Sequence, residues 1–312
     1  MKKYSLILAC CISATLSTTA FSGHQYPNNI EEVLIEGNVS ANQTRIELPE
    51  HPVLDTSQLL KKSPGANSNN NGPLTGLVQI RGLYGQRVTT KINGSKISSG
   101  GPNLMDPPLS YAPAATLEKL VVYRDIAPVS AAQETLGGAI IATPWRAPFS
   151  HNSDSEITGR LIGSYQSASE ATEVLATTAV ATRHHKGMIS ILDNRGNDAE
   201  FKAGRIKPTE FERQRTEIAY GFQSNSHTFS ASFLRNETDD AGTPALPMDI
   251  AFIDTDSTQL RYRYETGNKG IKLTVNHAEI EHAMSNFHLR QAPAMDMNYR
   301  HTLATGDSND GH

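Results

Sequence analysis

The second half of the chain alternates apolar and polar positions in short segments. Between Arg213 and Phe222, for example, Thr216, Ile218 and Tyr220 share one face and the residues between them share the other. This period of two predicts antiparallel strands with one apolar face. By this criterion we expect eight strands, at residues 156–166, 171–182, 187–194, 213–224, 227–237, 256–266, 270–281 and 295–303.

The connections between these expected strands alternate in length after the second strand. The short ones are 184–186, 225–226 and 267–269, and the long ones are 195–212, 238–255 and 282–294. Short turns at one end and long loops at the other are typical of an outer-membrane β-barrel. A soluble β-sandwich is the alternative, but it has no reason to sort its loops in this way. The mean hydropathy of −0.41 agrees with a barrel, whose strands contain no long apolar run.

Residues 31–145 have a different pattern, in which short apolar runs are separated by turn residues. We expect a capped helix at 55–62, a polar loop at 68–72, strands at 74–81, 87–92 and 118–124, and a helix or turn at 110–117. Asn93-Gly94 predicts a tight hairpin, because both central residues of such a turn need positive φ. The expected fold class is a small α+β domain followed by an antiparallel transmembrane β-barrel.

The first residues have the features of a secretory signal peptide. Lys2 and Lys3 precede an apolar run at 6–20, and small residues lead up to Ser22. We expect cleavage of residues 1–22 during export. A membrane anchor is the alternative, but the run is short for a spanning helix.

Both cysteines of the chain, Cys10 and Cys11, lie inside this signal peptide. A lipoprotein signal ending at Cys10 would leave too short an apolar run, so the exported chain is expected to have no thiol and no disulfide. Without Lys2 and Lys3 the net charge falls from −4 to −6. This negative charge disfavours a nucleic-acid partner, which attracts basic surfaces.

Residues 78–111 and 137–144 resemble the plug of TonB-dependent outer-membrane receptors. The resemblance implies a plug inside a barrel of 22 strands in the outer membrane of a Gram-negative cell. It also implies a TonB box at residues 30–37, which would pair with TonB by β-augmentation, with ExbB and ExbD behind TonB. Outer-membrane lipid and a transported metal ion complete the expected partners.

The resemblance gives an expected domain organisation. Residues 1–22 are the signal peptide, 23–145 the TonB box and plug, and 150–312 the N-terminal part of the barrel. About eight of 22 strands cannot surround a plug, because barrel diameter grows with strand number. The last residues, from Gly306, resemble a polar loop rather than a closing strand. We therefore expect the sequence to be a fragment or a truncated product.

Three stretches resemble the copper-receptor branch of this family, the OprC/NosA type. Residues 101–108 match its plug loop, 282–290 match an outer barrel loop, and 240–250 match a further stretch. The resemblance implies that the receptor imports copper ions and binds them between the plug loop and the outer barrel loop.

The metal ligands that this resemblance implies are Met105, His282 and Met284. The branch also has a cysteine ligand, but that position here is Gly101. Thioethers favour Cu(I), and residues two apart in a strand face the same side, so this set suits a Cu(I) ion. Without the thiolate we expect weaker binding or another metal, and Asp106 is a possible substitute ligand.

Other interpretations stay open. The chain could be a receptor for a siderophore or another metal chelate, or a fragment that transports nothing. The three ligand candidates could be ordinary packing and loop residues. Met295 and Met297 form a second methionine pair, which we interpret as one face of a strand.

The sequence has no Gly-x-Ser-x-Gly elbow and no phosphate-binding glycine loop, so we expect no enzymatic activity.

Overall fold

The computed structural model describes residues 43–47, 53–97, 99–101, 104–133, 135–151 and 154–311. The predicted signal peptide and TonB box lie outside these residues and remain predictions. In the described part of the chain, no helix has the length and apolar character needed to cross a membrane.

The first part of the described chain is an α+β domain with a five-stranded sheet. Its strands, in spatial order, are β1 (Gln43–Glu47), β7 (Leu117–Tyr123), β8 (Ala139–Pro144), β5 (Thr89–Ile92) and β6 (Ser95–Lys96). Strands β5 and β8 are parallel, and the other pairs are antiparallel. The predicted hairpin is confirmed, since Asn93 and Gly94 have φ values of 53° and 89° between β5 and β6.

Among its described residues, this domain also contains a smaller sheet and four 3₁₀ helices. The sheet contains β2 (Ala66–Asn70), β3 (Gly76–Ile80) and β4 (Leu83–Tyr84), and the helices are η1 (Thr56–Lys62), η2 (Gly85–Arg87), η4 (Pro108–Tyr111) and η5 (Ala114–Thr116). The Asp55 carboxylate caps η1 by accepting a hydrogen bond from the backbone N–H of Ser57 at 2.9 Å. The predicted polar loop at 68–72 is wrong over residues 68–70. That segment is strand, because its backbone pairs with β3 while its polar side chains stay largely exposed.

The second part is an eight-stranded antiparallel sheet in which each long strand pairs with the next one. Its strands are β9 (Glu156–Gln166), β10 (Ala171–Ala181), β11 (His185–Gly196), β14 (Phe211–Ser224), β15 (His227–Ala241), β16 (Asp249–Thr266), β17 (Lys269–Ser285) and β18 (His301–Gly311). The hairpin of β12 (Ala199–Phe201) and β13 (Gly204–Ile206) lies in the long connection between β11 and β14. Seven of the eight predicted strands are confirmed, and the short and long connections alternate as expected.

The prediction for the last strand is wrong. Residues 295–300 hold a loop with the short helix η7 (Asp296–Asn298), and the strand begins at His301 instead. The segment from Gly306, predicted as a polar loop, belongs to β18. Its polar sequence gave no strand signal, but it pairs with β17 from Ser285↔His301 to Val275↔Gly311. The partner strand therefore determines this strand, not the local side-chain pattern.

One face of the large sheet is apolar and exposed. The exposed side chains face each other across neighbouring strands, as in the pairs Ile189↔Ile218 and Ile218↔Phe233. They are Ile157, Leu161, Tyr165, Val174, Val180, Ile189, Ile191, Ile218, Tyr220, Phe229, Phe233, Leu260, Tyr262, Ile271, Leu273 and Val275. A continuous apolar face of this size is typical of the lipid-facing surface of an outer-membrane barrel.

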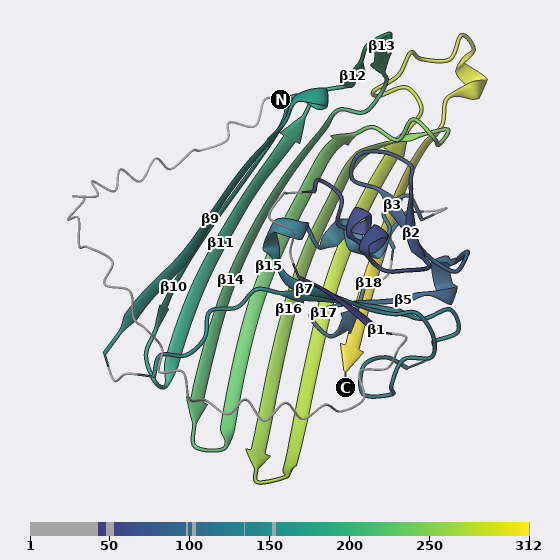
Figure 1. The fold of residues 1–312 in the computed structure, drawn as a ribbon. Helices are drawn as coiled ribbons and strands as arrows, with labels where there is room; N and C mark the ends of the chain where they lie inside the picture. The colour runs from purple at the N-terminus through teal and green to yellow at the C-terminus, as the bar shows by residue number, and fades with distance from the viewer. Residues whose placement is uncertain are drawn as a thin grey trace, which may run out of the picture. The chain divides into compact units, whose positions relative to one another are not determined.

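The opposite face of the large sheet packs against the α+β domain, which lies in front of it in Figure 1. A single cluster of buried residues joins the two parts. It includes Leu60, Met105, Leu109 and Leu120 from the α+β domain and Ile250, Ile253, Ile280 and Met284 from the sheet. This shared core fixes the position of the domain's loops against the sheet.

Candidate metal site between the plug loop and strand β17

The loop that follows β6 is organised around one buried carboxylate, that of Asp106. It accepts hydrogen bonds from the backbone N–H groups of Gly100 at 2.6 Å and Gly101 at 2.8 Å. The hydroxyl groups of Ser99 and Tyr111 donate to it as well. A carboxylate has about four acceptor sites, and four donors from the same domain occupy them here. Asp106 therefore holds the loop together.

These contacts also determine the charge of Asp106. Burial raises the pKa of its carboxyl. The His282 imidazole and the hydroxyls of Ser99 and Tyr111 lower this pKa by more than burial raises it, so the net pKa lies below its usual value. Burial and the contact with Asp106 raise the pKa of the Tyr111 hydroxyl well above its usual value. The pair thus consists of a carboxylate anion and a neutral phenol that donates to it.

His282 approaches this loop from strand β17. Its side chain is completely buried, and its Nδ1 atom lies 3.5 Å from Oδ1 of Asp106. Neither ring nitrogen has a hydrogen-bond partner in the described structure. Leaving a buried polar group without a partner costs about 1–3 kcal/mol, so most native structures avoid it. The nitrogens of the imidazole are therefore available to bind a ligand that is not part of the protein.

The two methionines predicted as ligands lie in the same buried region. Met284 is completely buried and is on the same face of β17 as His282, two residues away. Met105 precedes Asp106 in the plug loop, is 2% exposed, and belongs to the same core cluster as Met284. The structure thus places the loop that carries Met105 against the strand that carries His282 and Met284, with the contact between Asp106 and His282 joining the two. Among the residues that it describes, no three His, Cys, Asp or Glu side chains form a metal-binding group, so a metal here would need the thioethers.

Gly101 lies directly against the His282 ring. A Cβ atom added at Gly101 would be 2.4 Å from both Nδ1 and Cε1 of His282. A side chain at position 101 would thus point at the imidazole, and in this chain the imidazole fills that space.

The sequence suggested Asp106 as a substitute metal ligand, but its contacts favour a different role. Its oxygens are occupied by donors of its own loop, and it lies beside the imidazole. A carboxylate in this arrangement orients a histidine ligand rather than binding the metal itself. Ser99 and Tyr111, which hold Asp106, were not identified from the sequence, since single hydroxyl residues give no pattern.

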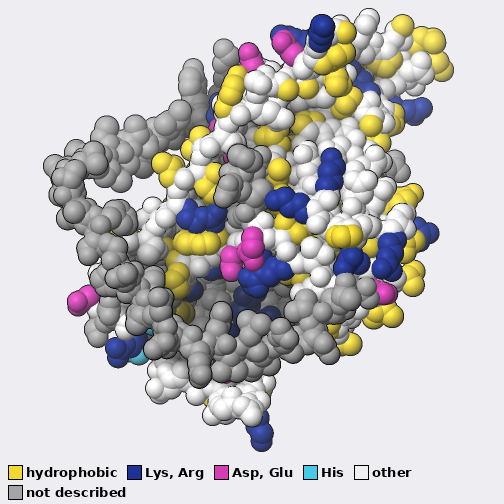
Figure 2. All heavy atoms as spheres, viewed as in Figure 1, with side chains coloured by type: hydrophobic (Ala, Val, Ile, Leu, Met, Phe, Trp, Pro, Cys, Tyr) yellow, Lys and Arg dark blue, Asp and Glu magenta, His cyan; other side chains and the backbone are white. Residues whose placement is uncertain are grey.

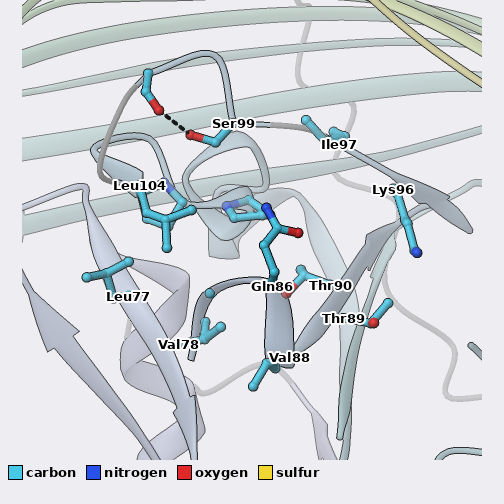
Figure 3. Close-up of a pocket in the computed structure, with 14 residues that line it drawn as sticks. Leu77, Val78, Gln86, Val88, Thr89, Thr90, Lys96, Ile97, Ser99 and Leu104 are labelled. Atoms are coloured by element: carbon cyan, nitrogen blue, oxygen red, sulfur yellow. Dashed lines mark hydrogen bonds between the residues drawn. The ribbon is translucent and has the colours of Figure 1, made fainter. Parts of the chain in front are cut away.

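A cavity of about 530 Å³ opens in the plug beside the loop. Figure 3 shows Ser99 and Leu104 of the loop on one side of it and Val78 and Val88 on the other. Gly101 also lines it, so the cavity reaches the backbone that surrounds Asp106.

Two long loops of the sheet are tied together near the site. Arg290 donates to both carboxylate oxygens of Asp249 at 2.6 Å, and Asp249 accepts from the backbone N–H of Thr243 at 2.8 Å. Met295 and Met297 lie in the second loop but are 58% and 80% exposed, and the prediction that they form a strand face is wrong.

The comparisons with known proteins agree with this architecture. Residues 35–139 match the model of the TonB-dependent receptor plug domain. No curated protein sequence matches the chain.

Several solved structures have a similar fold. The copper transporter OprC is 21% identical with a TM-score of 0.78, and the match covers 87% of this chain and 43% of that one. The ferric enterobactin receptor PfeA is 12% identical with a TM-score of 0.64, covering 87% and 46%. The iron transporter FrpB of Neisseria meningitidis is 16% identical with a TM-score of 0.63, covering 78% and 41%. The chain thus spans less than half the length of each of these structures. Identities this low establish the fold alone, so the chain has the TonB-dependent receptor fold, with a plug domain at residues 35–139 followed by barrel strands.

Proposed function

We propose that this protein belongs to an outer-membrane receptor that imports copper ions with energy from TonB. The observation that carries the proposal is the buried imidazole of His282, which has no hydrogen-bond partner. Its strand also carries the buried Met284, and the loop that it contacts carries the buried Met105. The similarity to the copper transporter OprC supports the same cargo. Enzymatic activity forms no part of the proposal.

The ligand set determines which metal is favoured. Met105 and Met284 supply thioethers, and His282 supplies an imidazole nitrogen. Thioethers are soft and neutral ligands that select Cu(I), and imidazole binds copper in either oxidation state. With Gly101 in place of a cysteine, the set carries no anionic sulfur. The copper ion would therefore bind reversibly, as a transported cargo should.

Asp106 is the proposed positioning residue of this site. If Nδ1 of His282 carries the proton, the carboxylate stabilises that tautomer and Nε2 is the nitrogen that faces the metal. Asp106 belongs to the plug and His282 to the barrel sheet. A rearrangement of the plug would therefore separate Met105 and Asp106 from His282 and Met284, and the copper would be released.

TonB is the proposed source of this rearrangement. We propose that the cleaved signal covers residues 1–22, that the TonB box lies within 30–37, and that TonB pulls this strand with ExbB and ExbD behind it. The domain boundaries at 23–145 and 150–312 are part of the same proposal.

Uptake of a ferric chelate is the second candidate. It is supported by the similarity of the fold to the ferric enterobactin receptor PfeA and the iron transporter FrpB. Copper accumulation in cells that carry the complete gene, measured with and without TonB, separates the two. The copper proposal predicts TonB-dependent accumulation of copper that added ferric enterobactin does not reduce. Accumulation of iron chelate but not copper would support the second candidate instead.

A further inference from the structure

A second cavity lies at the opposite end of the sheet from the candidate metal site, near the short turns. It has a volume of about 680 Å³ and lies between the sheet and the segment that follows β8. Ala147, Pro148 and Phe149 of that segment line it on one side, and residues of β11, β14, β15, β16 and β17 line it on the other. A volume of this size accommodates a small molecule.

Basic side chains dominate this cavity. Six of them line it, namely Lys119, Arg146, Lys186, Arg261, Arg263 and Lys272, and no Asp or Glu is among the described residues that line it. Figure 2 shows Lys and Arg side chains gathered around a hollow on this face of the molecule. So many cations around one space repel each other and attract an anion.

Only two of these cations have a carboxylate partner in the described structure. Arg146 pairs with Glu217, and Arg263 lies 3.6 Å from Glu265. Lys186 instead donates to the backbone carbonyl of Ala147 at 2.6 Å. The carboxylates that lie near the cavity therefore balance a minority of its charge.

Arg261 provides the most specific indication of a ligand. Its side chain donates to the backbone carbonyl of Asn93 at 2.8 Å, which fixes the guanidinium on the wall of the cavity. Its Nε atom is buried and has no hydrogen-bond partner. The guanidinium is thus held in place at the wall of the cavity, and an ordered guanidinium is suited to binding a carboxylate or a phosphate.

We propose that this cavity binds a small multivalent oxyanion, with Arg261, Lys186 and Lys272 as its main contacts. The site is separate from the candidate copper site. Lys272 and His282 are ten residues apart on β17, which corresponds to roughly 33 Å along a strand. A bare copper ion is repelled by such a cavity, so the two sites take ligands of opposite charge, and this inference does not depend on the copper proposal.

Isothermal titration calorimetry of the purified metal-free protein in neutral detergent tests the proposal. The probes are inorganic pyrophosphate and the tricarboxylate tricarballylate, which distinguish a phosphate ligand from a carboxylate ligand. We expect saturable binding of at least one probe, weakened about tenfold or more in the double variant Lys186→Gln/Arg261→Gln. Binding should also weaken as the salt concentration rises.

The matched control is Lys202→Gln/Arg205→Gln, which removes the same charge from the exposed β12–β13 hairpin. It should bind the probes as the unchanged protein does. Because Arg261 also holds the plug, Lys272→Gln is a second variant at an exposed side chain, and it should weaken binding as well. The proposal is wrong if neither probe binds, or if the control weakens binding as much as the two cavity variants do.

Discussion

The Nδ1 atom of His282 lies 3.5 Å from the Oδ1 atom of Asp106, and both side chains are completely buried. One residue belongs to a barrel strand and the other to a loop of the plug. The candidate site is thus divided between the large sheet and the plug, which is the part that TonB is proposed to move. This division connects the position of the plug directly to the geometry of the site.

Replacement of Asp106 tests its role as the centre of the loop. Each carboxylate oxygen of Asp106 accepts from two donors, so in Asp106→Asn the NH₂ group would face two donors from which it cannot accept a hydrogen bond. We expect a loss of about 2–3 kcal/mol in stability and about 10–100-fold weaker Cu(I) binding. Thermal unfolding and Cu(I) titration measure the two effects. The exposed carboxylate of Asp296 is the control, and an Asp106→Asn protein that behaves like Asp296→Asn would contradict this role.

Addition of a single methyl group at Gly101 tests the contact with His282. A Cβ there would be 2.4 Å from the imidazole ring, so Gly101→Ala must displace the ring or the loop. We expect about tenfold weaker Cu(I) binding. At Gly163 in β9 an added Cβ meets nothing within 4 Å, so Gly163→Ala should bind Cu(I) normally. Equal affinities in the two variants would show that the ring does not lie where the structure has it.

Much of this fold could be predicted from the sequence, because the signals were local. The alternation at 213–222 and the Asn93-Gly94 turn each depend on nearby residues only. Strands β2 and β18 were missed because their sequences are polar, and only their pairing with β3 and β17 makes them strands.

Less of the candidate site than of the fold could be predicted from the sequence. His282 and Met284 could be placed on one face from their spacing, and Met105 came from the resemblance to copper receptors. The contact of Asp106 with His282 joins residues 176 positions apart, and no local pattern encodes it. The same is true of the second cavity, whose cations come from five separate segments.

The ion pair between Arg290 and Asp249 is expected to order the two long loops near the site. Asp249 is completely buried, so Arg290→Ala would leave its charge without a partner, at a cost of about 3–5 kcal/mol. Limited proteolysis should then cleave within residues 242–248 much faster. Arg235 forms an exposed pair with Glu237, and Arg235→Ala should change neither stability nor cleavage noticeably. Similar cleavage of both variants would contradict the role of Arg290.

The apolar face of the sheet is expected to contact lipid. Leu260 lies in the middle of that face, so Leu260→Arg should lower the free energy of unfolding from lipid vesicles, and hence the stability, by about 2–4 kcal/mol. Phe201 is similarly exposed but lies in the β12–β13 hairpin of a long loop. Phe201→Arg should therefore fold normally, and equal effects of the two changes would exclude this face as the lipid contact.

Replacement of His282 is expected to affect the stability of the protein and its metal binding differently. His282→Leu removes two buried nitrogens that have no hydrogen-bond partner and replaces them with apolar atoms. We expect the metal-free protein to keep or gain stability, while it loses the stabilisation that added Cu(I) provides. Thermal unfolding with and without Cu(I) measures both effects. If the variant unfolds much earlier without metal, the imidazole serves the structure and not a ligand.

The most direct measurement is a competition titration of the purified protein against a Cu(I) chelator of known affinity. Met105→Leu and Met284→Leu keep the volume of the core but remove one thioether each, and His282→Leu removes the imidazole. The exposed residues Met297 and His277 provide controls of the same chemistry. The account predicts that each of the three site changes weakens Cu(I) binding about tenfold or more, whereas Met297→Leu and His277→Leu leave it unchanged. Cu(I) affinity that is the same in all five variants and the unchanged protein would contradict the assignment of this site.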